Sequence, residues 1–428
     1  MNFIKTTVLV FLLLPQIIVG QTKTLKEKAI QAFKEENYPK AIKLMKAASK
    51  KHPKDAEVFY YLGVFTHYNA YDSRPLAGYD VSYSETVFKY LDKALEINPG
   101  LGNARYFYTA ECGAAATRAL RNGKDEKFAE YLKKAYKKGG LPDWAIGYGK
   151  RLLSQVPQDA ILFTHGDFIF NTLNYLQFCR SERTDVSVIP LALLNRPWYV
   201  LEVKGGGLMR NVAMNISKPQ IMSMHPYKWE ATRISLDVPE KLCQKYKMDA
   251  GYTMDWKVDP DLTSNRVISK IEGEKAQPRR YLSGQRAVLM SILETNKWER
   301  PVFFSKGFEK YYLAGLDAYF QDYGLVHKLL PMKTKETEWK INSEGLERLV
   351  LDGSYEDYKD VLKNDQPRAS RILSTYYSPF ISLAMHYKQT GSEKKVEEVI
   401  QAFRRKIMIG FRKDYEKKVL EYLKKIKE

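Results

Sequence analysis

Residues 161–199 constrain the fold more than any other part of the chain. This stretch begins with a short apolar run, Ile161–Thr164, which His165-Gly166-Asp167 interrupts. Apolar residues at helical spacing follow, and residues 187–194 form a second, almost wholly apolar run. Apolar runs of this kind suit strands that are covered on both faces, and an intervening helix is what a parallel crossover requires. The pattern therefore predicts a strand–helix–strand unit of an α/β fold.

Polar and aromatic residues follow both predicted strands. Because ligands of open α/β sheets bind beyond the carboxyl ends of the strands, Asp167 and the loop with Asn195, Trp198 and Tyr199 are expected at a binding rim. His165 lies two residues before Asp167, so both side chains point to one side of an extended segment. Asp167 is open to three interpretations: a cap of the following helix, a ligand contact, or an acid–base partner of His165. The loop residues suit sugar or peptide recognition, or packing over the sheet end.

Helices and apolar strands continue to alternate after this unit. We predict a helix over 281–296, a strand over 301–305, a helix over 311–318 and a strand over 324–330. These elements give a small three-layer α/β domain with a mostly parallel sheet over residues 159–335. The intervening stretch, to about Pro278, is expected to be rich in loops. Its Lys204-Gly205-Gly206-Gly207 run is either a flexible connection or an anion cradle.

The residues before the α/β segment are helical and repetitive. Small and apolar residues recur at Tyr38, Ala41, Met45, Ala48 and Pro53. This pattern resembles the tetratricopeptide repeat, in which small residues lie where paired helices approach and a proline closes the second helix. About three such pairs over residues 21–158 are expected to stack and leave a concave groove. Phe59, Tyr60, Phe65 and Tyr68 would line this groove and bind proteins, or form the core of a purely architectural arm.

The two ends of the chain indicate its location and its partners. Residues 1–20 have the pattern of a secretory signal, which predicts an exported, periplasmic or envelope-associated protein without a membrane span in the mature chain. Residues 336–428 are expected to be helical, with a repeat-like pair and a basic last helix. The net charge is +19, and export makes nucleic acid an improbable partner. Acidic proteins and anionic lipid are the better candidates, and a solvated basic face is the alternative.

The sequence contains no complete catalytic or metal-binding pattern. Its six histidines lie far apart, and no GxSxG, HExxH or phosphate-loop motif occurs. The three cysteines, Cys112, Cys179 and Cys243, have neither metal-site nor disulfide-framework spacing. A buried free thiol is the expected state of Cys179, and a Cys112–Cys243 bridge is an alternative that no pattern favours. No metal, cofactor or catalytic residue is therefore predicted.

Several separated motifs of the middle region resemble one family in the right order. They are a Gly-Asp before a Tyr-Leu helix, an Arg-x-Asp-Val strand entry, Leu-Asn-x-x-Trp-Tyr and Arg-Pro-Val-x-Phe, carried by Gly166, Asp167, Tyr175, Leu176, Arg183, Asp185, Val186, Leu194, Asn195, Trp198, Tyr199, Arg300, Pro301 and Phe303. Over residues 161–330 the chain is similar to the soluble C-terminal region of protein O-mannosyltransferase-like multi-span membrane proteins. Phe168-Ile169-Phe170 replaces a polar cluster of many bacterial members. The membrane-embedded transferase part has no counterpart here, so the resemblance implies an accessory or recognition domain.

These observations give a leading hypothesis and a rival. The leading hypothesis is a non-catalytic, exported envelope protein of a Gram-negative bacterium, a scaffold or accessory subunit of a secretion or glycosylation assembly. Envelope proteins would bind to the helical repeats. The rival is a glycan-binding protein or glycan-processing enzyme that uses the rim around Asp167. Association with anionic lipid is a third, weaker hypothesis, and it predicts binding that salt abolishes.

Overall fold

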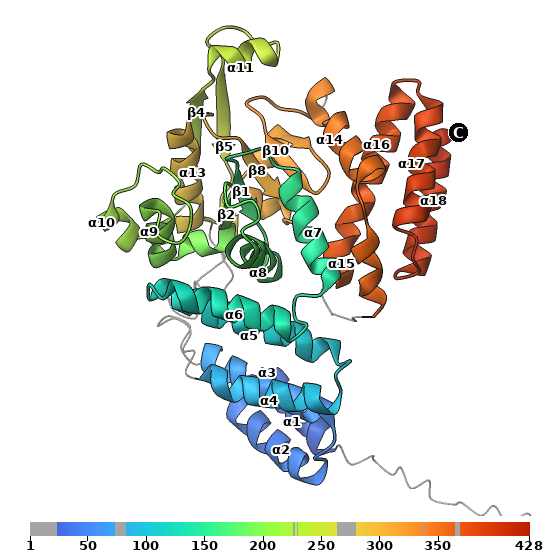
Figure 1. Cartoon of the computed structure of the whole chain (residues 1–428). Coiled ribbons are helices and arrows are strands. Elements are labelled where there is room, and N and C mark those ends of the chain that lie inside the picture. The colour runs from blue at the N-terminus through green and yellow to red at the C-terminus, as the bar shows by residue number, and fades with distance from the viewer. Residues whose placement is uncertain are drawn as a thin grey trace, which may run out of the picture.

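The fold is described from a computed structural model of residues 24–72, 83–225, 227–228, 230–262, 280–335, 337–363 and 369–428. The predicted signal sequence lies outside these described residues. Along the chain there follow a stack of helices, an α/β unit and C-terminal helices that pack on the α/β unit (Figure 1). Within the described ranges, none of the helices combines the length and the hydropathy that a membrane span needs.

Six helices form the N-terminal stack, and each packs against the next. They are α1 (Leu25–Lys34), α2 (Tyr38–Lys51), α3 (Ala56–Asp72), α4 (Ser84–Ile97), α5 (Gly102–Arg121) and α6 (Asp125–Lys137). A capping box of Thr24 and Glu27 starts α1, and the Asn37 side chain caps α2. Gly63 allows α3 to approach α4, because a Cβ there would lie 2.9 Å from Leu91 Cδ2. The predicted helical arm is therefore confirmed, while its identity as tetratricopeptide repeats stays a prediction.

A five-stranded mixed sheet forms the centre of the α/β unit. Its order is β2-β1-β8-β10-β9, with β1 (Ile161–Thr164), β2 (Ser187–Pro190), β8 (Val302–Ser305), β9 (Phe320–Asp322) and β10 (Val326–Leu329). Strand β1 pairs in parallel with β2 and β8, which confirms the predicted crossover, whereas β10 is antiparallel to both of its neighbours. The second strand ends at Pro190 rather than at residue 194. Proline donates no backbone hydrogen bond, and the chain continues as the 3₁₀ turn η3 (Leu191–Asn195).

Four helices surround the sheet. They are α7 (Asp143–Ser154), α8 (Asp167–Asn174), which continues as the π-helical turn η2 (Tyr175–Cys179), α9 (Pro197–Gly205) and α13 (Gly284–Asn296). Helix α8 packs against both α5 and α7, and η2 packs against α6, so the helical stack lies directly on the α/β unit (Figure 1). Helix α7 belongs structurally to the α/β unit, because it packs on α8 and on the C-terminal region.

The predicted loop-rich stretch contains regular structure. Strands β4 (Thr232–Asp237) and β5 (Thr253–Val258) form an antiparallel ribbon, with α11 (Glu240–Lys245) at its tip (Figure 1). A small sheet joins β3 (Tyr227–Lys228), β7 (Arg280–Leu282) and β6 (Asp261–Leu262), and α10 (Lys218–Met222) precedes it. The loop prediction is thus wrong here. Buried and exposed residues alternate along β4 and β5, and this period of two was visible in the sequence.

The C-terminal region is helical, as predicted. Its elements are η6 (Glu338–Lys340), α14 (Ser343–Glu347), η7 (Arg348–Asp352), η8 (Glu356–Leu362), α15 (Ala369–Leu373), η9 (Ser374–Tyr376), α16 (Tyr377–Gln389), α17 (Glu393–Lys406) and α18 (Lys413–Lys427). The helix predicted over 311–318 is instead two 3₁₀ turns, η4 (Lys310–Leu313) and η5 (Leu316–Tyr319). Ala314 and Gly315 between them have φ values of 54° and 85°, which a continuous helix cannot accommodate.

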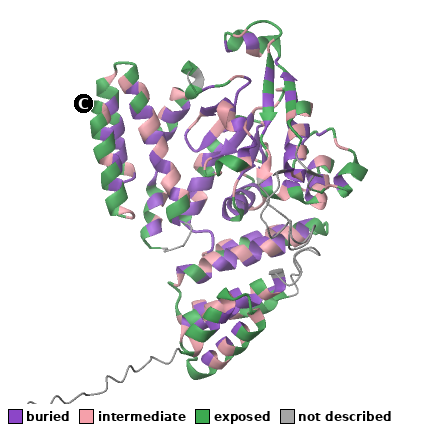
Figure 2. Ribbon diagram, turned by 180° about the vertical axis from the view of Figure 1, so that it is seen from behind, coloured by how far each residue is buried: buried purple, intermediate pink, exposed green. Residues whose placement is uncertain are grey.

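An arginine of α7 fastens the C-terminal region to the α/β unit. The Arg151 guanidinium donates to Asp357 Oδ1 and to the Ser354 carbonyl, each at 2.7 Å, and to Tyr376 Oη at 2.7 Å. Asp357 comes so close to α7 that a Cβ at Gly147 would lie 1.8 Å from its Oδ2 atom. Buried apolar side chains from all three regions form one continuous core (Figure 2). The C-terminal helices are therefore an integral part of the fold.

Two further arginines hold the edge at which the parallel strands begin. Arg300 donates from Nε to the Asp159 carbonyl (2.8 Å) and from Nη2 to Ser187 Oγ (2.7 Å), and it also reaches the carbonyls of Ala160 and Asn211. Arg183 donates to both carboxylate oxygens of Asp185 and to the carbonyls that follow α7. These clamps satisfy backbone groups where three short strands enter the sheet.

We predict that Arg300→Ala destabilises the protein much more than Arg210→Ala. The Arg300 side chain is 18% exposed, and its loss would leave several part-buried acceptors unpaired, so the free energy of unfolding should fall by about 1–3 kcal/mol. Arg210 also pairs with Asp159, but both side chains are more than 40% exposed, so its removal should cost less than about 1 kcal/mol. Urea denaturation measures both values, and equal losses would contradict the assigned clamp.

The Arg183–Asp185 pair predicts a defined acid sensitivity. Hydrogen bonding to Arg183 lowers the pKa of Asp185 from its ordinary value of 3.8 to about 2. Between these values the unfolded state binds the proton and the folded state does not, so this stabilisation is present above 3.8 and is lost as the pH falls toward 2. The stability advantage over Asp185→Asn should shrink across this window. Asp249→Asn, at an exposed position, is the control, and a pH-independent difference would contradict the prediction.

Candidate functional site

Three parallel strands end at one edge of the sheet, and the predicted rim lies there. Strands β1, β2 and β8 are followed by His165-Gly166-Asp167, by η3, and by Lys306-Gly307-Phe308. Helices α8 and α13 both begin near this edge, because each runs back along the sheet before the next parallel strand. The sequence therefore located this edge correctly, but the structure gives several of its residues roles other than those expected.

The polar side chains near the start of α13 form hydrogen bonds and an ion pair within the protein. Asn195 Oδ1 accepts the backbone N–H of Gln285 at 2.9 Å, and its Nδ2 donates to Gln285 Oε1 at 3.3 Å. Asp261 accepts the Ser283 N–H at 2.9 Å and lies 2.9 Å from Nε of Arg286, which is fully buried. Asn195 thus joins η3 to the first turn of α13, and its amide serves the fold rather than an open site.

The aromatic residues of the loop differ in exposure. Tyr199 is completely buried, and its ring meets Phe170 edge-on at 6.5 Å between centroids. Burial raises the pKa of the Tyr199 phenol, whose oxygen has no hydrogen-bond partner within the described part of the chain. Trp198 is half-buried and packs at a right angle to Tyr199. The expectation that Tyr199 contacts a ligand is therefore wrong for this structure, because it is a core residue.

Asp167 and His165 also differ from expectation. Helix α8 begins at Asp167 itself, and Gly166 with φ 87° occupies the N-cap position, which makes no side-chain cap. Asp167 is exposed in the first turn, where the positive end of the helix favours a carboxylate. The His165 ring packs against Phe308 and Tyr312, with centroids 5.1 Å away in each case. His165 therefore forms part of an aromatic cluster at the rim.

This rim cluster, defined as His165, Phe308, Tyr311 and Tyr312, is the feature that sequence reasoning missed. The Tyr311 ring is tilted against Tyr312 with centroids 4.2 Å apart, and Tyr311 is 42% exposed. Gly166 and Gly307 lie in the same two segments, and a Cβ at either would meet no atom within 4 Å, so the space beside the rings is open. The available signal was three aromatic residues directly after the strand over 301–305, at its carboxyl end. Such rings suit stacking on a sugar or on a flat apolar group.

A lysine beside the rim cluster is held by an ion pair. Lys306 Nζ lies 2.8 Å from Asp322 Oδ1 and donates to Ser378 Oγ at 2.7 Å. Burial opposes ionisation of Asp322, but the Lys306 charge outweighs it, and the pKa of Asp322 lies below its ordinary value. Burial lowers the pKa of nearby His327 to about 4, so this imidazole is neutral at pH 7. Lys306 is therefore a charged structural link to α16, and this arrangement does not suit a general base.

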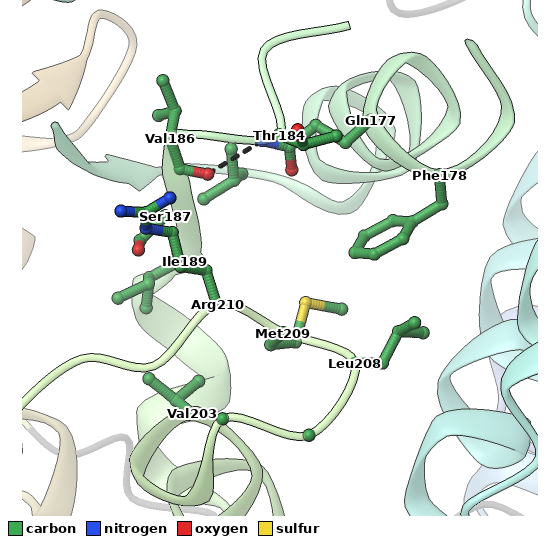
Figure 3. A pocket seen from close by; sticks show the side chains of 13 residues that line it. Gln177, Phe178, Thr184, Val186, Ser187, Ile189, Val203, Leu208, Met209 and Arg210 are labelled. Atoms are coloured by element: carbon green, nitrogen blue, oxygen red, sulfur yellow. Dashed lines mark hydrogen bonds between the residues drawn. The ribbon is translucent and has the colours of Figure 1, made fainter. Parts of the chain in front are cut away.

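A cavity of about 180 Å³ lies along β2, which is an edge strand of the sheet (Figure 3). Phe178, Leu208 and Met209 border it, together with Val186–Ile189 of the strand segment. The glycine run ends α9, since Gly206 adopts φ 65° as the C-cap. The backbone N–H of Met209 donates to Glu202 at 3.2 Å, so the chain's own carboxylate lies beside the glycine run. The cavity suits a small, mainly apolar group.

Three of the aromatic residues predicted for the groove, Tyr60, Phe65 and Tyr68, belong to a row of rings across three helices of the stack. In this aromatic row, Phe33 of α1 stacks on Phe65 of α3 at 4.5 Å, and Phe107 of α5 lies 6.4 Å from both Tyr60 and Tyr68. Phe65 is fully buried, so its assignment to an open groove is wrong. Tyr68 is 37% exposed, and Phe59 and Tyr60 are half-buried. The row thus combines a buried centre with partly exposed rings.

The remaining candidates do not assemble into a reactive centre. Cys112, Cys179 and Cys243 are free thiols on α5, η2 and α11, without the alternative Cys112–Cys243 bridge. Burial raises the pKa of Cys112 and of Cys179, which disfavours their thiolate forms. Among the described residues, no three histidine, cysteine or carboxylate side chains gather closely enough to hold a metal ion.

Comparisons with known proteins match the middle region of the chain. The family model of TMEM260-associated domain 2 matches residues 145–232 and 255–347. Protein O-mannosyl-transferase TMEM260 of the mouse (Mus musculus) is 38% identical over 53 residues, which is 12% of this chain and 8% of the mouse protein. The chain thus aligns with a small share of that relative's length, and no solved structure matches it. The α/β unit is therefore similar to a domain associated with TMEM260.

Proposed function

We propose that this protein is a non-catalytic, exported binding protein that serves as a scaffold or accessory subunit of a secretion or glycosylation assembly. The observation that carries the proposal is the aromatic row on α1, α3 and α5, whose partly exposed rings at Tyr60 and Tyr68 suit contact with another protein. The similarity to a TMEM260-associated domain supports a place near a glycosylation system. The signal-like residues 1–20 support export.

The chemistry of the rim supports binding rather than catalysis. Asn195 and Asp261 are engaged at the start of α13, and Lys306 is paired with Asp322. Asp167 is the exposed carboxylate at this edge, and catalysis by it would require an additional cooperating group. The described residues offer rigid, aromatic surfaces on one continuous core, which is what a recognition protein needs.

We predict that Tyr60→Ala combined with Tyr68→Ala removes partner proteins without unfolding the chain. The full-length tagged protein would be cross-linked in its own cells, purified from envelope extract and sized. Wild type should migrate in a larger assembly, and the double variant should lose it because the exposed rings of the aromatic row are gone.

Tyr90→Ala combined with Tyr131→Ala is the matched control, since these half-buried tyrosines lie on α4 and α6 outside the aromatic row. Thermal unfolding would verify that both double variants remain folded. Recovery of wild type only as a free monomer would contradict the scaffold, as would equal loss of the assembly in the two variants.

A second candidate function is glycan recognition at the rim cluster. The exposed Tyr311 ring beside Tyr312, the open backbone at Gly166 and Gly307, and the neighbouring Asp167 carboxylate favour it. Flat rings stack on the apolar faces of sugars, while a carboxylate accepts hydrogen bonds from their hydroxyl groups. The name of the mouse relative makes a mannose-bearing peptide the first probe to use.

We predict that a mannosylated peptide raises the melting temperature of wild type more than the same peptide without the sugar. Tyr311→Ala should weaken this binding at least about tenfold, because the most exposed ring of the rim cluster is lost. Tyr83→Ala, which removes a similarly exposed tyrosine at the start of α4, is the control. Calorimetric titration measures the affinities. Identical responses to both peptides would exclude glycan recognition by this cluster.

A further inference from the structure

One flank of α18 carries tyrosines and lysines in one stripe. Tyr415, Lys418, Tyr422 and Lys425 follow one another at intervals of three or four residues, so they lie on the same side of the helix. All four are exposed, and Tyr415 and Tyr422 retain 44% and 47% of their surface. We call this set the α18 stripe. Helix α18 is the outermost helix of the C-terminal region (Figure 1).

The adjoining face of α18 packs on the protein. Val419 and Leu423 are buried against the bundle, and the buried Glu416 carboxylate accepts the backbone N–H groups of Gly410 and Arg412 at 3.0 and 3.1 Å. These contacts fix the rotation of α18 about its axis. The α18 stripe therefore stays partly exposed along one flank of the fixed helix, and it needs no rearrangement to meet a partner.

Helices α16 and α18 run in the same direction and widen this surface. The Tyr377 and Tyr415 rings, near the start of each helix, lie 5.0 Å apart, and Lys388 near the end of α16 donates to the Lys427 carbonyl at 2.8 Å. Met385 lies between these two contacts along α16 and is 39% exposed. Three of the eight exposed large apolar or aromatic side chains of the described chain, Met385, Tyr415 and Tyr422, therefore belong to these two helices.

The charge of this region is strongly positive and largely unneutralised. Between Arg404 and Glu428 there are ten lysines and arginines against four acidic residues. Within the described chain, neither Lys418 nor Lys425 has a carboxylate partner at ion-pair distance. The Arg412 guanidinium lies over the Tyr415 ring at 4.6 Å, which adds a further cation at the end of the α18 stripe.

We infer that the α18 stripe docks the protein on an anionic lipid surface. Lysines beside a membrane are attracted by anionic headgroups, and tyrosine rings settle at the boundary between headgroups and acyl chains. A stripe that alternates both residue types along one helix face presents charge and amphipathic rings in the same plane. A soluble polyanion would use the lysines alone, so the exposed tyrosines favour the lipid surface as the partner.

The test uses the full chain and vesicles of phosphatidylcholine that contain about one third phosphatidylglycerol. Sedimentation should recover the protein with these vesicles and not with pure phosphatidylcholine. Binding should fall steeply as salt rises from about 0.1 M to about 0.5 M, because the attraction is screened. If soluble polyglutamate of equal charge displaces the protein completely, the partner is an acidic polymer and the lipid assignment is wrong.

Matched variants of the same helix locate the contact. Lys418→Glu with Lys425→Glu reverses two charges of the α18 stripe, and Lys417→Glu with Lys424→Glu makes the same change about 100° around the helix. The first pair should weaken vesicle binding at least about tenfold and the second less than about threefold. Tyr415→Ser with Tyr422→Ser should also weaken binding at unchanged charge. Equal effects of both lysine pairs, or no effect of the tyrosine pair, would overturn the inference.

Discussion

The half-buried guanidinium of Arg300 forms the hydrogen bonds on which the central sheet depends. Strands β1, β2 and β8 have four residues each, so their mutual hydrogen bonds are few. Arg300 compensates by bonding the carbonyls before β1 and the first residue of β2 from a position just before β8. The guanidinium fork suits this role because it directs several donors within one plane. The beginnings of the strands are therefore devoted to stability, which leaves the opposite edge available for recognition.

The difference between the two edges of the sheet also explains the structural roles of the motif residues that resemble the TMEM260-associated domain. Arg183, Asp185 and Arg300 match the family motifs and lie within the matched ranges, and all three serve the clamped edge. Asn195 matches as well and fixes the start of α13. The shared motifs therefore describe a scaffold. The rim cluster at Phe308, Tyr311 and Tyr312 lies outside those motifs, so the resemblance says nothing about its role.

Local patterns predicted the elements whose causes are local. The strand Ile161–Thr164, the helix after it and the second strand are all present. Their residues are mostly apolar and buried, and this apolar composition can be read from the sequence alone. The alternation of buried and exposed residues in β4 and β5 was also visible in the sequence, but we interpreted this stretch as rich in loops. The two turns around Ala314 and Gly315 could not be predicted from the sequence, because tertiary contacts impose the left-handed backbone at an alanine. The roles of Asn195 and Tyr199 were hidden for a related reason, since they depend on Gln285 and Phe170, which only folding brings near.

The ion pair at Lys306 has a mechanical consequence. Lys306 begins the segment that carries Phe308, Tyr311 and Tyr312, and through Ser378 the same ammonium grips the first turn of α16. Helix α16 in turn carries α18 on its flank. The aromatic edge of the sheet and the terminal bundle are therefore linked through Lys306 and α16. A surface that binds α18 would therefore also fix the orientation of the rim cluster relative to that surface.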